Sequence, residues 1–419
     1  MAPEQVEVLV VGAGPAGLAA AIELRRLGAG RLKVVDREPV PGGIPRLCHH
    51  TGFGLHDLRR LQDGPGYARH YLRQAEAAGV EISPSTTITG WQGPATLVYS
   101  SPGGLGSVEA RAILLATGCR ERPRTARLVP GSRPHGVFTT GSLQRFVYEH
   151  HLPVGRRAVI VGAELVSLSA LLTLAHAHAS VAAMITELPR HQIYFPYLPF
   201  KWAVADLLTR TPVVAGARLG RILGRQRVEA VEIMHLASGL TETVACDTVV
   251  FTGDWIPEHE LARLGGLAID PGTRGPRVDA SLRTSARGAF AAGNLLHGAE
   301  TADLCAVEGR RAARHIAEYL ESGMWPERTL PLHVEPPVEW IFPNAISLPL
   351  GGSASSRFSF RVREFCRDVV LTVTQGERRL YWHRFRRLSP NTSMHLDGGW
   401  VAAVDMSAMG PELKLRAEG

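Results

Sequence analysis

A glycine-rich turn close to the N-terminus carries the first residues whose types and spacing could do chemistry. Gly12, Gly14 and Gly17 fit the pattern GxGxxG, directly after an apolar, β-branched run over residues 6–11. At such a turn the first glycine permits a tight bend, the second lets backbone approach a pyrophosphate, and the third lets helix and strand pack closely. The phosphates then lie at the positive end of a helix. Asp36 ends the next apolar run, where its carboxylate can accept hydrogen bonds from ribose hydroxyls, so the spacing predicts a dinucleotide site.

A second turn of the same kind follows later in the chain, but it is altered. Gly162 matches the first glycine, whereas Glu164 and Ser167 stand at the second and third positions. A carboxylate at the second position would meet the like charge of a pyrophosphate in a cramped turn. Glu187 stands where Asp36 stands in the first unit, so we expect the fold to be kept. We predict a nucleotide-binding shape that does not bind NAD(P); the alternative is a nucleotide held with altered geometry.

A loop with two adjacent histidines lies between these turns. Residues 41–54 have the sequence PGGIPRLCHHTGFG. His49 and His50 can act as proton acceptors or substrate anchors, because imidazole titrates near neutral pH. The alternative is that one histidine caps the loop and the other packs in the interior. Cys48 has no neighbouring thiol, so we expect it to be structural.

Alternating apolar runs and helical segments predict the scaffold that positions these residues. The first turn lies in a βαβ unit with a strand over 6–11, a helix over 18–27 and a strand over 32–35. The second unit repeats this order over residues 158–161, 165–178 and 181–186. Further predicted elements are a helix over 67–78, strands over 112–115, 228–234 and 248–252, a strand within 278–294 and a long amphipathic helix over 301–320. The fold class is therefore α/β, with two Rossmann-like nucleotide-binding domains.

Three strand ends resemble motifs of two-domain flavoproteins. Ala292-Gly293-Asn294, with Thr284 upstream, resembles their "GD" segment, whose acid binds the ribityl chain; here asparagine replaces that acid. Ala116-Thr117-Gly118 and Thr252-Gly253-Asp254 resemble their "ATG" segments at the crossovers between domains. These motifs imply FAD as the cofactor.

The same resemblance places two further segments beside the flavin. The loop over residues 41–54 would run along the isoalloxazine. The helix that starts at Thr301 and Ala302 would point its N-terminus at the flavin, where its dipole stabilises the anionic reduced ring.

The segments GGIPRLCHHTGFG, VGAELVS and TGDWIPEHEL resemble the NAD(P)/FAD-dependent oxidoreductase subunits of multi-subunit dehydrogenases. This family includes the flavin subunits of opine oxidase, hydrogen cyanide synthase and hydroxyproline dehydrogenase, and the flavoprotein of glycerol-3-phosphate dehydrogenase-type complexes. The likeness covers about residues 5–325 and implies a glutathione-reductase-like flavoprotein. Many relatives end in a cysteine-rich iron–sulfur region, whereas this C-terminus has only Cys366. A partner subunit would therefore carry any cluster.

Motifs and resemblance together predict three domains. They are an FAD-binding domain over residues 1–125 and 273–325, a degenerate NAD(P)-binding-like domain over 126–272, and a β-rich C-terminal domain over 330–419. The predicted catalytic residues are His49 and His50. The predicted cofactor-binding residues are Gly12, Gly14, Pro15, Ala16, Gly17, Asp36, Arg37, Gly43, Arg46, Ala116, Thr117, Gly118, Gly293, Asn294, Thr301 and Ala302.

The C-terminal region says little about chemistry. The proline-rich stretch over 326–337 predicts a linker. Residues 358–363 and 369–374 are predicted strands. Five arginines among aromatic residues over 378–387 form either a docking face for an acidic partner or, as we favour, the solvated basic face of a strand pair.

Composition and charge exclude several classes of protein. The chain has 419 residues, 45% hydrophobic and 20% charged, which indicates two or three globular domains rather than disorder. The net charge of +7 is scattered along the chain, so we expect no nucleic-acid partner. The five cysteines contain no CxxC pair, so we expect neither a redox dithiol nor a metal site. There is no basic leader and no apolar run long enough to span a membrane, so we expect a cytoplasmic protein.

The leading hypothesis is an FAD-dependent dehydrogenase subunit. It would oxidise a small amine, amino acid or hydroxy acid and pass electrons to one or more other subunits. Two alternatives stay open: an NAD(P)H-dependent flavin reductase, and a non-catalytic FAD-binding scaffold subunit of a complex.

Overall fold

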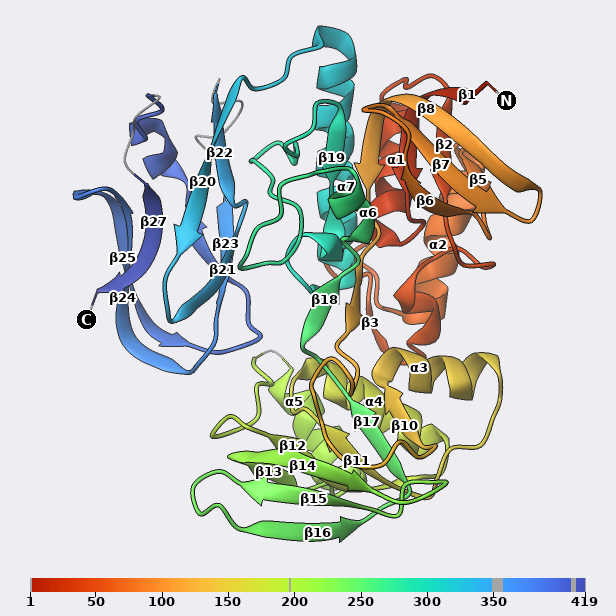
Figure 1. Cartoon of the computed structure of the whole chain (residues 1–419), viewed down its shortest axis with the longest axis vertical. Helices are drawn as coiled ribbons and strands as arrows, with labels where there is room; N and C mark the ends of the chain where they lie inside the picture. The colour runs from red at the N-terminus through yellow and green to blue at the C-terminus, as the bar shows by residue number, and fades with distance from the viewer. Residues whose placement is uncertain (1, 196, 349–356, 408–411, 419) are drawn as a thin grey trace. The chain divides into compact units, whose positions relative to one another are not determined.

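The computed structural model describes the chain apart from residues 1, 196, 349–356, 408–411 and 419 (Figure 1). Its internal contacts divide the chain into two compact units. Unit 1 comprises Met1–Arg46, Thr51–Cys119 and Pro257–Gly419, and unit 2 comprises Leu47–His50 and Arg120–Ile256. The assignment of a cofactor to each predicted domain remains a proposal.

Unit 1 is built around a mixed sheet whose centre is parallel. In β1 (Glu4–Val11), Val10 pairs with Val34 on one side and with Leu114 on the other. Both neighbours run parallel to β1, so the apolar run is buried on both faces. The remaining strands are β2 (Leu32–Val35), β5 (Glu81–Ser83), β6 (Thr87–Trp91), β7 (Thr96–Ser101), β8 (Gly104–Leu115) and β19 (Ala289–Ala291), in the order β5-β2-β1-β8-β7-β6 with β19 on β8.

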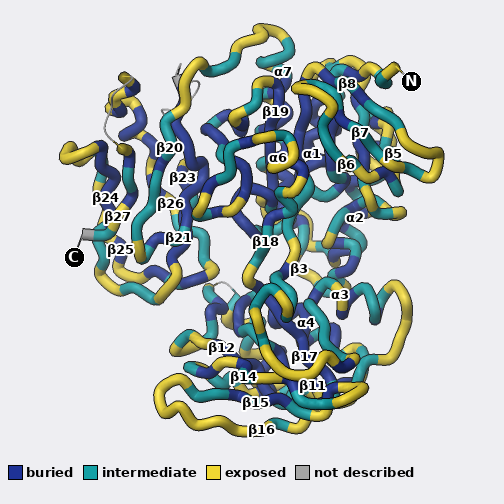
Figure 2. Tube along the Cα trace, in the orientation of Figure 1, coloured by how far each residue is buried: buried dark blue, intermediate teal, exposed yellow. Residues whose placement is uncertain are grey.

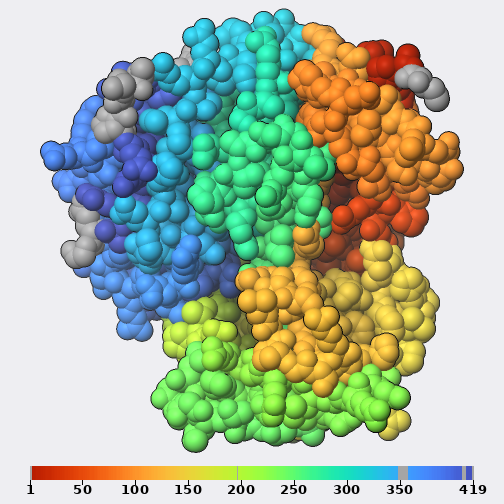
Figure 3. Space-filling model, viewed as in Figure 1, coloured from red at the N-terminus to blue at the C-terminus, as the bar shows by residue number. Residues whose placement is uncertain are grey.

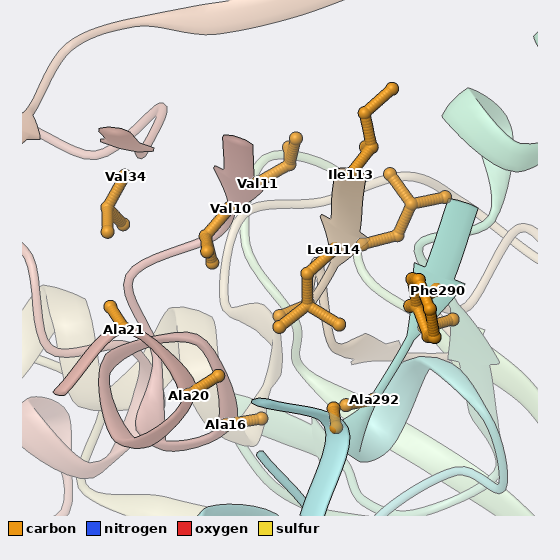
Figure 4. Packing of buried hydrophobic residues seen from close by; sticks show 14 of the residues in the cluster. Val10, Val11, Ala16, Ala20, Ala21, Val34, Ile113, Leu114, Phe290 and Ala292 are labelled. Carbon is orange, nitrogen blue, oxygen red and sulfur yellow. The ribbon is translucent and has the colours of Figure 1, made fainter. Parts of the chain in front are cut away.

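Small residues let two helices approach this sheet closely. Helix α1 (Pro15–Arg26) packs Ala16 and Ala20 towards the buried side chains of Val10, Leu114 and Phe290 (Figure 4). The sequence predicted the start of this helix too late, because proline at its first position is already set for helical geometry.

The long helix α7 (Ala302–Ser322) crosses α1 at a glycine. A Cβ on Gly309 would collide with the carbonyl oxygen of Ala16, so only glycine permits this close approach. The other long helix of unit 1 is α2 (Gly64–Ala77), which starts with the cap Asp63. The strand predicted within 278–294, directly before Ala292-Gly293-Asn294, is present but short: β19 covers Ala289–Ala291 and pairs with β8.

Unit 2 repeats the nucleotide-fold pattern. A five-stranded parallel sheet has the order β10-β17-β11-β12-β13, with helix α4 (Leu165–His176) connecting β11 to β12. A three-stranded antiparallel sheet, β14-β15-β16, completes the unit. The bounds are β10 (Val137–Thr139), α3 (Thr140–Gln144), β11 (Arg157–Val161), β12 (Ser180–Thr186), β13 (Val213–Ala215), β14 (Ala217–Leu223), β15 (Ala230–His235), β16 (Thr241–Ala245) and β17 (Thr248–Phe251). The predicted second βαβ unit is therefore present.

The C-terminal part of unit 1 is a β-rich domain with its own buried core; its described residues have the blue colours of the space-filling view (Figure 3). Its two sheets have the orders β22-β20-β27-β24-β25 and β21-β23-β26. Their strands are β20 (Arg328–Val334), β21 (Val338–Phe342), β22 (Ala345–Leu348), β23 (Arg357–Val362), β24 (Cys366–Gln375), β25 (Arg378–Leu388), β26 (Met394–Asp397) and β27 (Leu413–Glu418).

Two expectations for this region have clear outcomes. The predicted linker over 326–337 is wrong, because β20 lies within it and pairs with β22 and β27 through its backbone. Strand β25 is an edge strand, and its arginines are exposed (Figure 2). That agrees with the solvated-face interpretation.

Among the described residues, no helix is long and apolar enough to cross a bilayer.

Candidate functional site

Two of the three N-terminal glycines are required by the packing of the chain itself. Gly12 has φ 108°, a left-handed conformation that disfavours side chains, and a Cβ there would collide with the carbonyl oxygen of Ala116. A Cβ on Gly17 would collide with the carbonyl oxygen of Gly12. These two glycines let β1, α1 and the end of β8 come together.

Gly14 is different, because nothing in the chain requires a glycine there. Its φ of −81° suits any residue, and the nearest atom to an added Cβ is the Cα of Gly43, 3.9 Å away. It is the N-cap of α1 and makes no side-chain capping bond, and the first turn of α1, from Pro15, has no acidic residue. The absent side chain at this helix end therefore suits a diphosphate.

Gly43 faces this helix end from the neighbouring loop. It has φ 68°, and a Cβ placed on it would lie 2.9 Å from the Cα of Gly14. Two backbone segments without side chains thus lie opposite each other, and Ala16 is buried beneath them.

The acid and bases after β2 have defined partners. Asp36 accepts a hydrogen bond from the N–H of Ala13 through Oδ2, at 2.6 Å, and so fixes the glycine turn. Arg37 pairs with Glu258 at 3.3 Å. Arg46 pairs with Glu38 at 3.0 Å and is mostly buried.

The predicted segment over 116–118 follows β8 directly. Ala116 donates its N–H to Val11, at 2.8 Å, and so lies at the end of β1 beside the glycine turn. The Thr117 hydroxyl donates to the carbonyl of Glu258, at 2.8 Å. Gly118 has φ 76°, and an added Cβ would have no atom within 4 Å.

The strand end after β19 leads into α7. Gly293 has φ 76°, and Asn294 uses its amide within the loop, accepting from the N–H of Glu300 at 2.8 Å. Thr301 caps α7 by accepting from the N–H of Leu304. Ala302 is the first residue of the helix.

These residues fit FAD. The glycine turn, Asp36 and the helix end of α1 suit the adenosine diphosphate half, and the loop from Gly293 to Ala302 presents a second helix N-terminus to the flavin half. We propose the sixteen predicted residues as its binding set.

The second glycine turn has the same backbone but is filled by a side chain. The carboxylate of Glu164 lies over two glycines: an added Cβ would lie 2.7 Å from Oε2 at Gly162 and 2.8 Å from Oε1 at Gly253. Only 7% of Glu164 is exposed. Burial raises the pKa of this carboxyl, against hydrogen bonds from Thr252 and from the backbone N–H groups of Ala163 and Glu164 itself.

The other positions of this turn also differ from a nucleotide site. Ser167 is fully buried and its hydroxyl donates to the carbonyl of Glu164. Glu187, at the end of β12, is exposed. Because the carboxylate of Glu164 lies within this turn, over Gly162 and Gly253, we expect the turn to disfavour a pyrophosphate.

The histidine pair lies in the short segment of the loop that belongs to unit 2. His49 stacks on Tyr148 with ring centroids 4.0 Å apart and nearly parallel planes. His50 Nε2 lies 2.9 Å from the hydroxyl of Ser169, which itself accepts a hydrogen bond from the Gln144 amide at 2.8 Å. Either His50 or Ser169 donates in this contact, depending on the tautomer of His50.

Cys48 lies beside the same side chains and is half-buried. Burial raises the pKa of its thiol to about 12, so it stays protonated at neutral pH. A buried, protonated thiol is a poor nucleophile.

Sequence reasoning missed the contacts that hold the loops next to the proposed cofactor site. Asp303 accepts from the N–H groups of Gly54 and His56, at 2.8 and 2.7 Å, and so ties that loop to the start of α7. Its position in the first turn of a helix was the available signal. A second set, around Glu300 and Arg361, joins residues far apart in the sequence and had no signal.

Among the described residues, no group of three histidine, cysteine or acidic side chains is arranged to hold a metal ion.

Comparison with known proteins places the chain among flavoprotein oxidoreductases. The family model for pyridine nucleotide-disulphide oxidoreductases matches residues 6–309. An opine oxidase subunit of Agrobacterium tumefaciens (strain Ach5) is 30% identical over 336 residues, which cover 73% of this chain and 64% of that protein. The alpha subunit of sarcosine oxidase from Rhizobium meliloti (strain 1021) is 28% identical over 76% of this chain and 31% of that protein. The chain thus spans less than two thirds of these relatives.

Solved structures show the same fold. Thioredoxin reductase of T. acidophilum aligns with a TM-score of 0.64 and 21% identity, covering 76% of this chain and all of that one. L-proline dehydrogenase of P. horikoshii aligns with a TM-score of 0.56 and 17% identity, covering 77% of this chain and 57% of that one. The predicted α/β class with two Rossmann-like domains is confirmed.

Proposed function

Because the chain belongs to the pyridine nucleotide-disulphide oxidoreductase family of FAD-dependent oxidoreductases, we propose that it is the flavin subunit of a dehydrogenase. The proposed substrate is a small amine, amino acid or hydroxy acid. The electrons then pass to a partner subunit rather than to a nicotinamide.

One observation carries this proposal: the first glycine turn is open and the second is filled. Gly14 leaves the N-terminus of α1 without a side chain, whereas Glu164 stands at the equivalent position in unit 2 and its carboxylate lies over Gly162 and Gly253. A chain that keeps the flavin site and fills the nicotinamide site is suited to take electrons from a substrate other than NAD(P)H.

The cysteines support the same direction. A disulphide reductase needs two neighbouring thiols that can form a thiolate, and the sequence has no CxxC pair. Burial raises the pKa of Cys48 to about 12 and that of Cys305 well above its usual range. Neither thiol is suited to attack a disulphide at neutral pH.

The names of two relatives indicate the class of substrate and the assembly. These relatives are named as subunits of an opine oxidase and of a sarcosine oxidase, and opines and sarcosine are secondary amines. Each relative is one subunit of a larger protein. A similar assembly would provide the electron exit that this chain, with Cys366 alone in its C-terminal domain, does not provide.

When bound, FAD supplies the two-electron acceptor. The chain supplies binding and electrostatics: the α1 end holds the diphosphate, and the α7 end, at Thr301, favours negative charge on the ring. His49 and His50 remain the proposed groups for substrate binding and proton acceptance. The contact with Ser169 holds the His50 ring in a fixed orientation.

The test uses the full chain, purified with its FAD and kept under anaerobic conditions. Sarcosine, L-proline, an opine and a 2-hydroxy acid are added one at a time, with NADH as the comparison, and bleaching of the flavin band is followed. Bleaching by an amine, amino acid or hydroxy acid but not by NADH supports the proposal. Bleaching by NADH alone replaces it with a flavin reductase, and a flavin inert to all of them replaces it with a scaffold.

The histidines are tested with the substrate that bleaches the flavin. We expect His50→Ala to lower the rate of bleaching by about a hundredfold, as for loss of a general base, with FAD content unchanged. His150→Ala is the control, since this histidine of unit 2 is exposed. If His50→Ala and His49→Ala both bleach at the wild-type rate, neither histidine takes part in the reaction.

A further inference from the structure

Four buried charged groups surround the loop between β19 and α7. The side chains of His297, Glu300, Glu308 and Arg361 are only 7%, 13%, 11% and 7% exposed. Three of them lie on the loop or on α7. Arg361 comes from β23 in the C-terminal domain. Buried charges are costly unless each has a partner, so their contacts are informative.

Arg361 holds the end of this loop directly. Its Nη2 donates to Glu300 Oε1 at 2.6 Å and to the carbonyl of Ala299 at 2.7 Å. Its Nε donates to the hydroxyl of Ser393 at 3.0 Å, and Ser393 donates in turn to Glu300. The guanidinium also lies over the ring of Trp340, 5.2 Å from its centroid. Two side chains of the C-terminal domain, Arg361 and Ser393, thus donate hydrogen bonds to Glu300.

Glu300 passes this constraint to the residues proposed to face the flavin. Its backbone N–H donates to Asn294 Oδ1 at 2.8 Å, and the thiol of Cys305 donates to the same oxygen at 3.1 Å. Glu300 also directly precedes Thr301, the N-cap of α7. A displacement of Glu300 therefore moves the loop and the helix end together.

The other end of the loop is held in the same way. Glu308, on α7, accepts from the N–H of Gly293 and lies 3.5 Å from His297 Nε2. Burial acts to lower the pKa of His297, but Glu308 and Glu300 outweigh it and raise that pKa. Burial acts to raise the pKa of Glu300, but Arg361 and His297 lower it. Opposite charges therefore stabilise one another throughout the network.

We propose that Arg361 is a positioning residue for the flavin and that the C-terminal domain sets the flavin's properties through it. This inference rests on the proposed FAD site. Without Arg361, the Glu300 carboxylate is left buried beside Ser393 and His297, and the loop must shift to rehydrate it. Because backbone dipoles aimed at the ring set the stability of its reduced anion, such a shift changes the reduction potential.

The experiment compares Arg361→Gln with Arg363→Gln in the full chain. Arg363 is exposed directly after the end of β23, two residues beyond Arg361, and provides a matched loss of charge. FAD affinity, the flavin midpoint potential and the flavin absorption spectrum are measured, together with the melting temperature of the FAD-free protein. We expect Arg361→Gln to weaken FAD binding by roughly tenfold or more and to shift the potential and the spectrum, with Arg363→Gln unchanged.

The double variant Glu300→Gln/Arg361→Gln tests the route of the effect. It leaves no unpaired buried carboxylate, so we expect it to recover much of the wild-type affinity and potential. It also provides the measurement if Arg361→Gln does not fold. A double variant with the same FAD affinity and potential as Arg361→Gln contradicts action through Glu300. If Arg361→Gln does not fold, a double variant whose FAD affinity is roughly tenfold or more below that of the wild type contradicts it.

The outcomes separate this inference from the function on which it rests. If the wild-type protein binds FAD and the two single variants have equal potentials and affinities, the proposed role of Arg361 is overturned and the flavin site is not. This holds even if Arg361→Gln melts at a lower temperature. Wild-type protein that takes up no FAD overturns both the flavin site and the inference.

Discussion

The two glycine turns of this chain share a backbone and differ in one side chain. In the first, Gly12 donates to Val35 at 2.8 Å, and in the second Gly162 donates to Ile185 at 2.9 Å. The residues that follow β8 and β17 are hydrogen-bonded in the same way. The N–H of Ala116 donates to the carbonyl of Val11, and the N–H of Thr252 donates to the carbonyl of Val161. The bend itself is therefore the same in both units, whatever each one binds.

The two turns differ in the position of the carboxylate that lies near each of them. In the first, the carboxylate of Asp36 comes from the next strand and accepts from Ala13, which leaves the space beside Gly14 open. In the second, the carboxylate of Glu164 is buried over Gly162 and Gly253, while Glu187, which follows the next strand, is exposed. The comparison teaches that the same backbone bonds can keep a nucleotide fold whether its turn is left without a side chain or contains a buried carboxylate.

The strongest way to break this comparison is to give the first turn the side chain of the second. We expect Gly14→Glu to fold, because the nearest atom to the new Cβ, apart from its chain neighbours, is the Cα of Gly43 at 3.9 Å. We expect its affinity for FAD to fall by more than about a hundredfold. Flavin content after purification and a titration with added FAD measure this. The control is Gly103→Glu, which adds the same charge at an exposed turn. A yellow Gly14→Glu protein would show that the diphosphate lies elsewhere.

The reverse exchange has a smaller expected effect. Glu164→Gly removes the buried carboxylate from the second turn, so NADH binding should strengthen by about tenfold, measured by calorimetry. Serine still stands at the third position, at Ser167, so full affinity is not expected. Glu187→Gly is the control. Equal NADH affinity in wild type and Glu164→Gly would mean that Glu164 is not what excludes the nucleotide.

The smallest effect concerns stability and its dependence on pH. Burial raises the pKa of Glu164, so the folded chain binds more protons than the unfolded chain. Stability must then fall as pH rises through the window from the unfolded to the folded pKa. We expect Glu164→Gln to melt a few degrees above wild type at neutral pH and to lose this advantage at pH values below the unfolded pKa of about 4.3. Glu187→Gln should show no such trend. An advantage that grows as pH falls would contradict the burial argument.

Much of the fold was predictable because its patterns are local. The apolar run before Gly12, the altered turn at Glu164 and the helix end at Thr301 all lie within a few residues of the structure they predict. The errors arose where pairing partners are distant. Prolines around β20 indicated a linker, yet its backbone pairs with β22 and with β27, which is more than seventy residues later.

The residues of the candidate site show the same contrast between local patterns and distant contacts. Sequence identified Gly14 and Asp36 from their spacing, and it identified His49 and His50 from their type. It did not identify that His49 stacks on Tyr148, since ring contacts between distant segments leave no periodic trace. Nor did it identify Asp303 as the acceptor for the loop at Gly54.

The sequence by itself determined the two nucleotide folds, the flavin-type turn and the carboxylate in the second turn, because backbone conformation and short-range sterics depend on neighbouring residues. Only the tertiary structure decided that Glu164 is buried over Gly253 and that Arg361 grips Glu300. The physical reason is that burial and charge pairing depend on which distant segments exclude water from a side chain, and no local pattern specifies that.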